Sequence, residues 1–261
     1  MAQVDVNAVS VTFPVYDTGT RSLKSTLFRS GATGGAFVRS KSGNRVTAIQ
    51  ALEEIDLHLR DGDRVALIGH NGSGKSTLLR AVAGIYEPTV GSIRTEGIKF
   101  PLFNVSLGMD PDSTGYENII LRGLYMGLTR KDIAALVPEI AEFSGLEGYL
   151  HLPLRTYSAG MRMRLAFSVI TSVRADILLI DEGLGTGDAA FVEQASQRIE
   201  AFSAQSPIVM LAAHNPALLR RMCNQAILLH HGRLLAQGGL DEILSEYRAL
   251  SGAGAVEPRR A

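Results

Sequence analysis

The sequence predicts an α/β fold built around a sheet of parallel strands. From Ala51 onward, short apolar runs alternate with helical patterns, and this alternation is typical of parallel sheets whose strands are joined by helices. Four of the runs have the character expected of strands buried on both faces. They are RVALIG (64–69), ILLID (177–181), PIVMLAA (207–213) and QAILLHH (225–231). With 261 residues, 46% of them hydrophobic, the chain can bury a large core in one or two domains.

Composition excludes several classes of protein. The 26 basic side chains balance the 26 acidic ones, so no overall charge favours nucleic acid or an anionic surface. The single cysteine, Cys223, cannot form an internal disulfide, which suits a reducing compartment. The N-terminus lacks the basic start and apolar run of a secretory signal, and no apolar run approaches the roughly 18 residues that span a bilayer. We therefore expect a cytosolic chain whose membrane role, if it has one, depends on a partner.

The rest of the chain has a predictable organisation. Val4 to Phe13 alternates loosely and predicts a strand, whereas residues 17–47 have no sustained period and predict a mobile surface insertion. This insertion carries six Lys or Arg and one acid, so it is either a solvated loop or a membrane-surface contact. Thr129 to Leu150 is mostly helical in pattern and predicts a helical subdomain of about residues 115–172. We expect one domain over residues 1–250, followed by a frayed tail, 251–261.

A phosphate-binding loop follows the first buried strand. GHNGSGKST fits the pattern G-x-x-x-x-G-K-[ST] between a predicted strand and a predicted helix, the context that this pattern requires. Glycines let the backbone N–H groups turn toward phosphate oxygens, and the helix N-terminus adds positive charge. The loop residues are Gly69, His70, Asn71, Gly72, Ser73, Gly74, Lys75, Ser76 and Thr77. We expect Lys75 to reach the β- and γ-phosphates and the Ser76 hydroxyl to hold Mg²⁺.

Two carboxylates follow the strand ILLI. Asp181 comes at the carboxyl end of a parallel strand, where such sheets bind ligands, and can hold Mg²⁺ through water. Glu182 would then face the γ-phosphate, where a carboxylate can orient or deprotonate the attacking water. Either residue alone could be an ordinary strand end, and the upstream loop is what makes the pair a predicted catalytic site.

A second anion site is predicted some eighty residues after the loop. In TYSAGMRMRLAF, Ser158 begins an amphipathic helix, and this residue could simply be its N-cap. Ser158, the Gly160 backbone and the helix N-terminus could equally cradle an anion.

The phosphate loop, YSAGM, ILLIDEG and His214 occur in an order and at a spacing that resemble the nucleotide-binding subunit of an ABC transporter, from about Val4 to Tyr247. YSAGM stands where that family has its signature, usually written LSGGQ. The resemblance implies an ABC-type P-loop NTPase with a RecA-like core, an antiparallel β subdomain and the inserted helical subdomain. It also implies ATP and Mg²⁺ as ligands and a head-to-tail homodimer that encloses two ATP molecules.

The same resemblance assigns further residues. Ser158, Ala159 and Gly160 would contact the ATP held by a second chain, His214 would contact the γ-phosphate, and Asp188 would reach across the dimer. Either Phe13 or Tyr16 would stack on adenine. The glutamine that usually links the nucleotide to the membrane partner is missing, and Asn104 or Val105 stands near its position.

Variant motifs narrow the type of transporter. YSAGMRMRLAF, DEGLGTGD and the segment FPVYDTGTRSLKSTLF resemble ATPase subunits that export O-antigen, capsule or related glycans. The implied partners are two copies of an integral membrane permease, which would handle the lipid-linked glycan, and no nucleic acid. The chain would work on the cytoplasmic side of a bacterial inner membrane. The alternatives are another ABC exporter or importer, or an ABC ATPase that acts on DNA or ribosomes.

Overall fold

The computed structural model describes residues 1–15, 36–39, 46–103, 108–181 and 189–253. These residues form two compact units. The first unit comprises residues 1–101, 176–182 and 206–261, and the second comprises residues 102–175 and 183–205. The predicted helical subdomain, about residues 115–172, falls within the second unit, which also contains the later helix α6 (Ala189–Gln205).

An antiparallel sheet opens the first unit. Its strands run in the order β2-β3-β1-β5, with β1 at Gln3–Pro14, β2 at Ala36–Arg39, β3 at Val46–Arg60 and β5 at Val90–Glu96. The strand predicted over Val4 to Phe13 is therefore confirmed. Our prediction of an unbroken loop over residues 17–47 is wrong at β2 and at the start of β3, which pair with each other. Edge strands like β2 depend on a neighbouring strand more than on their own pattern.

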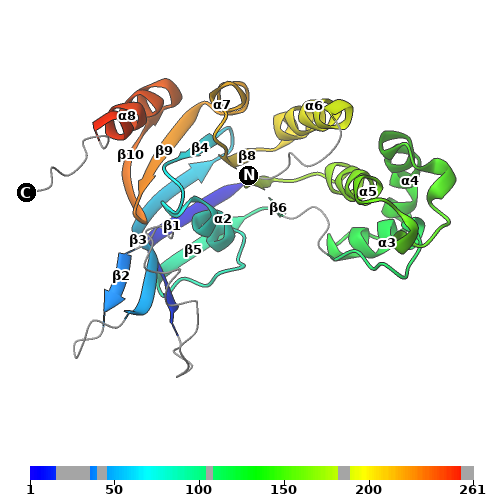
Figure 1. Cartoon of the computed structure of the whole chain (residues 1–261), viewed down its shortest axis with the longest axis horizontal. Helices are drawn as coiled ribbons and strands as arrows, with labels where there is room; N and C mark the ends of the chain where they lie inside the picture. Colours follow the sequence, from blue (N-terminus) through cyan, green and yellow to red (C-terminus); the bar gives the residue numbers. More distant parts are fainter. Residues whose placement is uncertain (16–35, 40–45, 104–107, 182–188, 254–261) are drawn as a thin grey trace, which may run out of the picture. The chain divides into compact units, whose positions relative to one another are not determined.

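The second sheet of this unit carries the predicted buried strands. Its order is β10-β9-β4-β8-β7-β6, and β9, β4, β8 and β7 are mutually parallel (Figure 1). The six strands are β4 (Arg64–Ile68), β6 (Lys99–Leu102), β7 (Ile177–Ile180), β8 (Ile208–Ala212), β9 (Gln225–His230) and β10 (Arg233–Gly239). All residues of β7 and β8 are buried, which confirms that apolar runs in this chain mark strands covered on both faces.

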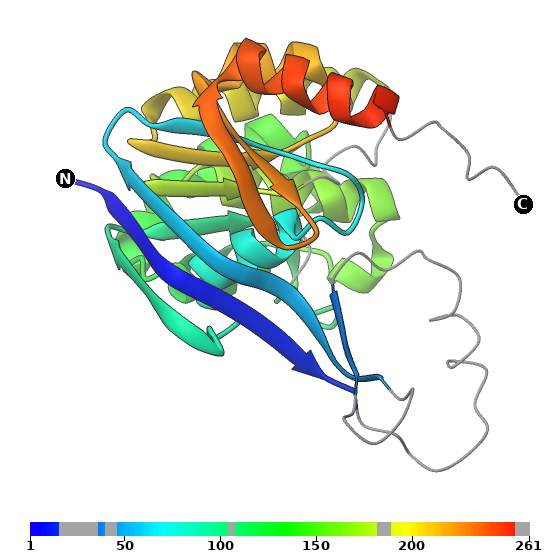
Figure 2. The same cartoon turned by 90° about the vertical axis from the view of Figure 1, so that its left-hand side faces the viewer.

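Helices cover the strands of the first unit. Helix α2 (Lys75–Val82) contacts β1, β3 and β5 of the antiparallel sheet and also β8 of the parallel sheet (Figure 2). Helix α7 (Pro216–Met222) follows β8, and α8 (Leu240–Ala253) contacts β4, β9 and β10. Because α8 continues to Ala253, the predicted tail begins in a helix, and residues 254–261 lie outside the described part of the chain.

The second unit is helical. It contains α3 (Gly115–Tyr125), α4 (Arg130–Ser144), α5 (Ala159–Thr171), α6 and two short 3₁₀ turns, η1 (Glu147–Tyr149) and η2 (Leu154–Thr156). Thr114 and Thr129 cap α3 and α4 through reciprocal bonds with the acid three residues later. Buried side chains from α3, α4 and α5 form one apolar core, so the helices support each other. None of the described helices of the chain has the length and apolar character needed to cross a bilayer.

Candidate nucleotide-binding site

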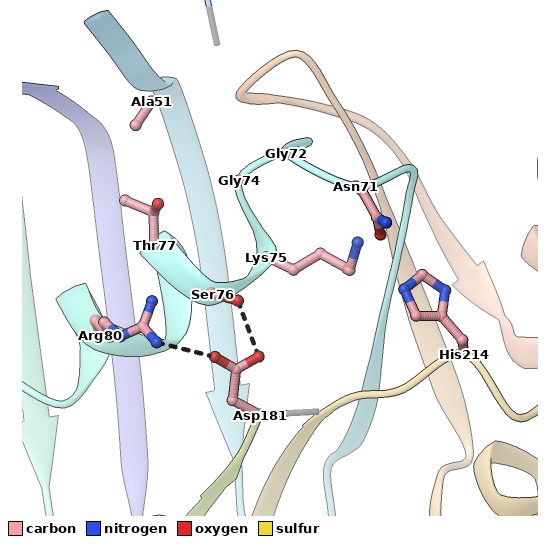
Figure 3. A pocket seen from close by; sticks show the side chains of 10 residues that line it. All are labelled: Ala51, Asn71, Gly72, Gly74, Lys75, Ser76, Thr77, Arg80, Asp181 and His214. Atoms are coloured by element: carbon pink, nitrogen blue, oxygen red, sulfur yellow. Dashed lines mark hydrogen bonds and ion pairs between the residues drawn. The ribbon is translucent and has the colours of Figure 1, made fainter. Parts of the chain in front are cut away.

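Three adjacent strands bring the predicted site residues of the first unit together. The phosphate loop follows β4, His214 follows β8, and Asp181 follows β7, and these strands are neighbours in that order. Because they are parallel, their carboxyl ends lie at one edge of the sheet. There they form a pocket of about 460 Å³ (Figure 3). Its lining residues are Ala51, Asn71, Gly72, Gly74, Lys75, Ser76, Thr77, Arg80, Asp181 and His214.

The loop glycines have steric reasons to be glycine. Gly69 has φ +152°, and a Cβ there would lie 2.2 Å from the Leu229 carbonyl oxygen. Gly74 has φ +109°, and a Cβ there would lie 2.9 Å from the Ala51 carbonyl oxygen. Gly74 is also the N-cap of α2, and it offers no side chain to bond the first N–H groups of the helix. The helix therefore begins with N–H donors suited to an anion.

Lys75 is buried at the base of this loop. Its Nζ donates to the carbonyl oxygens of Gly69 (2.7 Å) and His70 (2.9 Å), and only 9% of the residue is exposed. A buried ammonium group needs such oxygens or an anion beside it. The loop thus holds a cation at the floor of the pocket, where a phosphate would provide a stronger, charge-assisted partner.

Asp181 is held by two side chains of α2. Ser76 Oγ donates to Asp181 Oδ1 at 2.9 Å, and Arg80 Nη2 pairs with Asp181 Oδ2 at 3.3 Å (Figure 3). Arg80 was not among the site residues predicted from the sequence, although its position four residues after Ser76 places both on one face of the helix. Among the described lining residues, two cations, Lys75 and Arg80, face one carboxylate, so this pocket suits an anionic ligand.

His214 reaches the same pocket from the end of β8. The turn after it is fixed by Asn215, whose side-chain oxygen accepts from the N–H groups of Ala217 and Leu218 at the start of α7. His214 itself is exposed and lines the pocket on the side toward which Lys75 and Asn71 point (Figure 3). An imidazole in this position can donate a hydrogen bond to an anion in the pocket.

The turn between β9 and β10 is hydrogen-bonded to the phosphate loop. The N–H of Gly232 donates to the Ser73 carbonyl at 2.9 Å, and the Gly232 carbonyl accepts from the Glu53 N–H at 2.8 Å. Ser73 is fully buried, and its Oγ has no hydrogen-bond partner among the described residues. No local sequence pattern indicates this support, because Ser73 and Gly232 are far apart along the chain.

The predicted signature lies in the second unit at the start of α5. Ser158 is the N-cap, and its side chain accepts from the Met161 N–H at 3.1 Å. Ser158, Ala159 and Gly160 are exposed. The preceding Tyr157 is buried and its hydroxyl donates to the Tyr149 carbonyl at 2.7 Å, so it anchors this turn to the helical core.

Gly160 differs from the loop glycines. The nearest atom to a Cβ built there would be Ser158 Oγ at 3.8 Å, which is an ordinary contact. Gly160 also lies within α5, where glycine is a poorer helix former than alanine. Nothing among its described neighbours requires a glycine at this position.

The remaining predicted residues divide into two groups. Phe13, at the end of β1, packs edge-on against Tyr86 with ring centroids 5.1 Å apart, and Tyr86 is an aromatic neighbour that we had not predicted. Tyr16, Glu182, Asp188, Asn104 and Val105 lie outside the described residues.

Known proteins with similar sequences agree on one family. The family model described as ABC transporter matches residues 52–185. The O-antigen export system ATP-binding protein RfbE of Yersinia enterocolitica is 46% identical over 224 residues, which cover 86% of this chain and 92% of that protein. RfbB of Myxococcus xanthus, with the same description, is 39% identical over 81% of this chain, and TagH of Bacillus anthracis, a teichoic acids export ATP-binding protein, is 35% identical over 81%. The matches span only 49% of RfbB and 38% of TagH.

Solved structures with the same fold are more distant in sequence. An ATP-binding subunit of an ABC transporter has a TM-score of 0.66 at 22% identity, covering 94% of this chain and 93% of that one. The ATP-binding cassette MJ0796, solved as a dimer bound to ADP and Pi, has a TM-score of 0.65 at 18% identity, covering 91% and 98%. The predicted ABC-type fold is thus confirmed. From its sequence and its fold, the chain belongs to the ABC transporter family, as an ATP-binding subunit that hydrolyses ATP.

Proposed function

We propose that this chain powers the export of a lipid-linked polysaccharide, such as O-antigen, capsule or a similar glycan, across a bacterial inner membrane. The observation that carries the proposal is the 46% identity to an O-antigen export ATP-binding protein over 86% of the chain. An exporter of this kind needs ATP hydrolysis, and we assign that reaction to the pocket at the ends of β4, β8 and β7.

Lys75 and α2 bind the phosphates in this proposal. Lys75 exchanges its bonds to the Gly69 and His70 carbonyls for bonds to the β- and γ-phosphates, and the loop N–H groups from Gly69 to Thr77 surround the same oxygens. Either Phe13 or Tyr16 stacks on the adenine ring. The exposed segment of the loop that includes Asn71 and Gly72 closes over the phosphates.

Ser76 and Asp181 fit a Mg²⁺ ion. Their oxygens lie 2.9 Å apart, and hydroxyl and carboxylate oxygens are the hard ligands that Mg²⁺ prefers. When bound, the ion neutralises charge on the β- and γ-phosphates. Arg80 then keeps Asp181 oriented through the carboxylate oxygen that Ser76 does not contact.

Hydrolysis requires a base and a group that senses the γ-phosphate. Glu182, the residue after Asp181, accepts the proton that water loses as its oxygen bonds to the γ-phosphorus and the bond to ADP breaks. His214 donates a hydrogen bond to the γ-phosphate from the end of β8. In this proposal both residues act at the γ-phosphate, Glu182 on the attacking water and His214 on a phosphate oxygen.

A second copy of the chain completes the site. Ser158, Ala159 and Gly160 are exposed, and no described residue of the chain requires a glycine at position 160, so we propose that the partner's γ-phosphate requires it. Asp188 reaches across the same interface. The dimer is head-to-tail, and each of its two ATP molecules contacts one loop and the other chain's signature.

The dimer works beneath two copies of a membrane permease, at the cytoplasmic face of the membrane. We treat residues 1–250 as one nucleotide-binding domain, into which the helical subdomain of about residues 115–172 is inserted. Asn104 or Val105 takes the position of the family's usual glutamine. The permease, and not this chain, handles the glycan.

Deletion of the gene in its native bacterium tests the export role. We expect surface polysaccharide to disappear and lipid-linked glycan to accumulate inside the cell. The wild-type chain should restore export, Lys75→Ala should not, and the exposed control His151→Gln should restore it. Unchanged surface glycan in the deletion strain, with ATPase activity of the purified chain intact, would assign the chain to a different ABC transporter.

A further inference from the structure

Three histidines from distant parts of the sequence meet beside the phosphate loop. Ile68 of β4 pairs with Leu228 of β9 in a parallel register, so His70, two residues after the end of β4, and His230, the last residue of β9, lie at the same edge of the sheet. His231 follows in the turn to β10. The ring centroids are 5.0 Å apart for His70 and His230, 4.8 Å for His70 and His231, and 4.3 Å for His230 and His231.

His70 has the arrangement that a metal-ligating histidine usually has. Its Nδ1 lies 2.9 Å from the Asn71 carbonyl oxygen, which can only accept, so Nδ1 carries the proton. The lone pair is therefore on Nε2. That nitrogen is buried and has no hydrogen-bond partner among the described residues. A backbone carbonyl on one ring nitrogen and an available lone pair on the other is the usual second shell of a histidine ligand.

The backbone around the cluster is already fixed. His231 has φ +47° and Gly232 has φ +84°, so the two residues form a tight turn of the kind that joins β9 to β10. Gly232 is bonded to Ser73 of the phosphate loop and to Glu53 of β3. The turn that carries His231 is therefore attached to the loop that carries His70, and the three rings do not depend on a flexible segment to meet.

From these contacts we propose that His70, His230 and His231 bind a borderline divalent metal ion of the Zn²⁺ type, at a site separate from the Mg²⁺ position of Ser76 and Asp181. One ring nitrogen from each residue lies within 4.8 Å of the others. Tetrahedral Zn²⁺ with bonds of about 2.0–2.1 Å needs such nitrogens about 3.3 Å apart. His230 and His231 are exposed, so small side-chain rotations can bring the three nitrogens to the spacing that the ion needs. Water can take the fourth position.

The surroundings favour a metal over an anion. Partial desolvation of the ring, together with the neighbouring His231 and His70, lowers the pKa of His230, which favours the neutral imidazole that a metal requires. Three neutral imidazoles bind Zn²⁺, Ni²⁺ or Cu²⁺ better than Mg²⁺, which prefers oxygen. The buried thiol of Cys223 is no competitor, because burial raises its pKa to about 12.

A metal ion at this site would also affect nucleotide binding. Lys75 bonds to the carbonyl of His70, so a metal held by the His70 ring restrains the loop segment that Lys75 must leave when it binds phosphate. The ion would then link the β9–β10 turn to the phosphate loop, and metal occupancy would be coupled to nucleotide occupancy.

Calorimetric titration of Zn²⁺ into the full chain tests the site directly. The protein is prepared without a histidine tag, stripped with chelator and kept free of nucleotide. We expect one Zn²⁺ per chain for the wild type. The double variant His230→Gln/His231→Asn should bind at least about tenfold more weakly. Asparagine suits position 231, because it tolerates positive φ better than most residues.

A matched control removes two exposed histidines from elsewhere, as His58→Gln/His151→Gln. This control should keep the wild-type affinity and stoichiometry. Co²⁺ in place of Zn²⁺ should give the absorption bands of a nitrogen-bound ion in the wild type and the control, and lose them in His231→Asn alone. Absence of wild-type binding, equal binding by the cluster variant, or equal losses in the control would overturn the proposal.

Discussion

The two predicted anion sites, the phosphate loop before α2 and the signature before α5, begin helices in opposite ways. At α2 the N-cap is a glycine without a side chain, and the chain's own atoms crowd Gly69 and Gly74 so closely that no other residue fits. At α5 the N-cap is Ser158, whose side chain already satisfies an N–H group, and Gly160 has room for a methyl group. The fold therefore explains the glycines of the first site, whereas the second site is exposed and no described residue packs against Gly160 closely enough to require a glycine there. We interpret this difference as a sign that Ser158 to Gly160 contact a second copy of the chain.

The largest effect expected is on turnover. Glu182→Gln keeps the shape of the side chain and removes its basicity, so the rate of ATP hydrolysis should fall by about 10²–10⁴-fold. ATP should still bind between the loop of one chain and the signature of its partner. Gel filtration with ATP should therefore show a stable dimer. Hydrolysis at the wild-type rate would show that Glu182 is not the catalytic base.

Mixing two defective variants tests whether the signature acts on the partner's ATP or on the ATP of its own chain. In a Glu182→Gln background, chains with Lys75→Ala and chains with Ser158→Arg should each fail to retain ATP in a dimer. Mixed, they should trap one ATP per dimer, because both defects fall in one composite site and the other site is sound. If each signature acted on its own chain, every site in the mixed dimer would be defective. The absence of trapped nucleotide after mixing would count against the shared site.

The loop itself should control affinity. Lys75→Ala removes a charge-assisted partner of the phosphates, so ATP affinity of the isolated chain should fall by about 10–100-fold. Ser158→Arg should leave this affinity within about twofold, since charge-assisted bonds on the loop are untouched. Calorimetry on both variants measures the contrast. Equal losses of affinity would mean that both sites contact the same chain's nucleotide.

The smallest effect, on stability, tests the two glycines directly. Gly160→Ala should leave the free energy of unfolding unchanged or raise it by up to about 1 kcal/mol, because alanine is the better helix former. Gly69→Ala should lower it by about 2 kcal/mol or more, because its Cβ would clash with the Leu229 carbonyl at 2.2 Å. Denaturant unfolding compares the two variants. Destabilisation by Gly160→Ala would indicate an internal role for that glycine.

Features set by neighbouring residues were predictable from the sequence. The glycine and lysine spacing of the phosphate loop, the fully apolar strands β7 and β8 and the serine that caps α5 are local patterns, and each has a direct backbone or burial cause. The family resemblance followed from their order along the chain.

The sequence by itself therefore determined the ABC family, strand β1 and the four buried strands β4, β7, β8 and β9, and it predicted the chemistry of the phosphate loop. Only the tertiary structure decided which of these parts meet, because the pairing of distant strands leaves little trace in a local pattern. The order β9-β4-β8-β7 places Asp181 and His214 beside Lys75, gives Asp181 its partner Arg80, and brings His230 to His70 from a distant part of the sequence. The same limit explains why β2 was missed: an edge strand is formed by its pairing with β3, and residues 36–39 alone do not specify it.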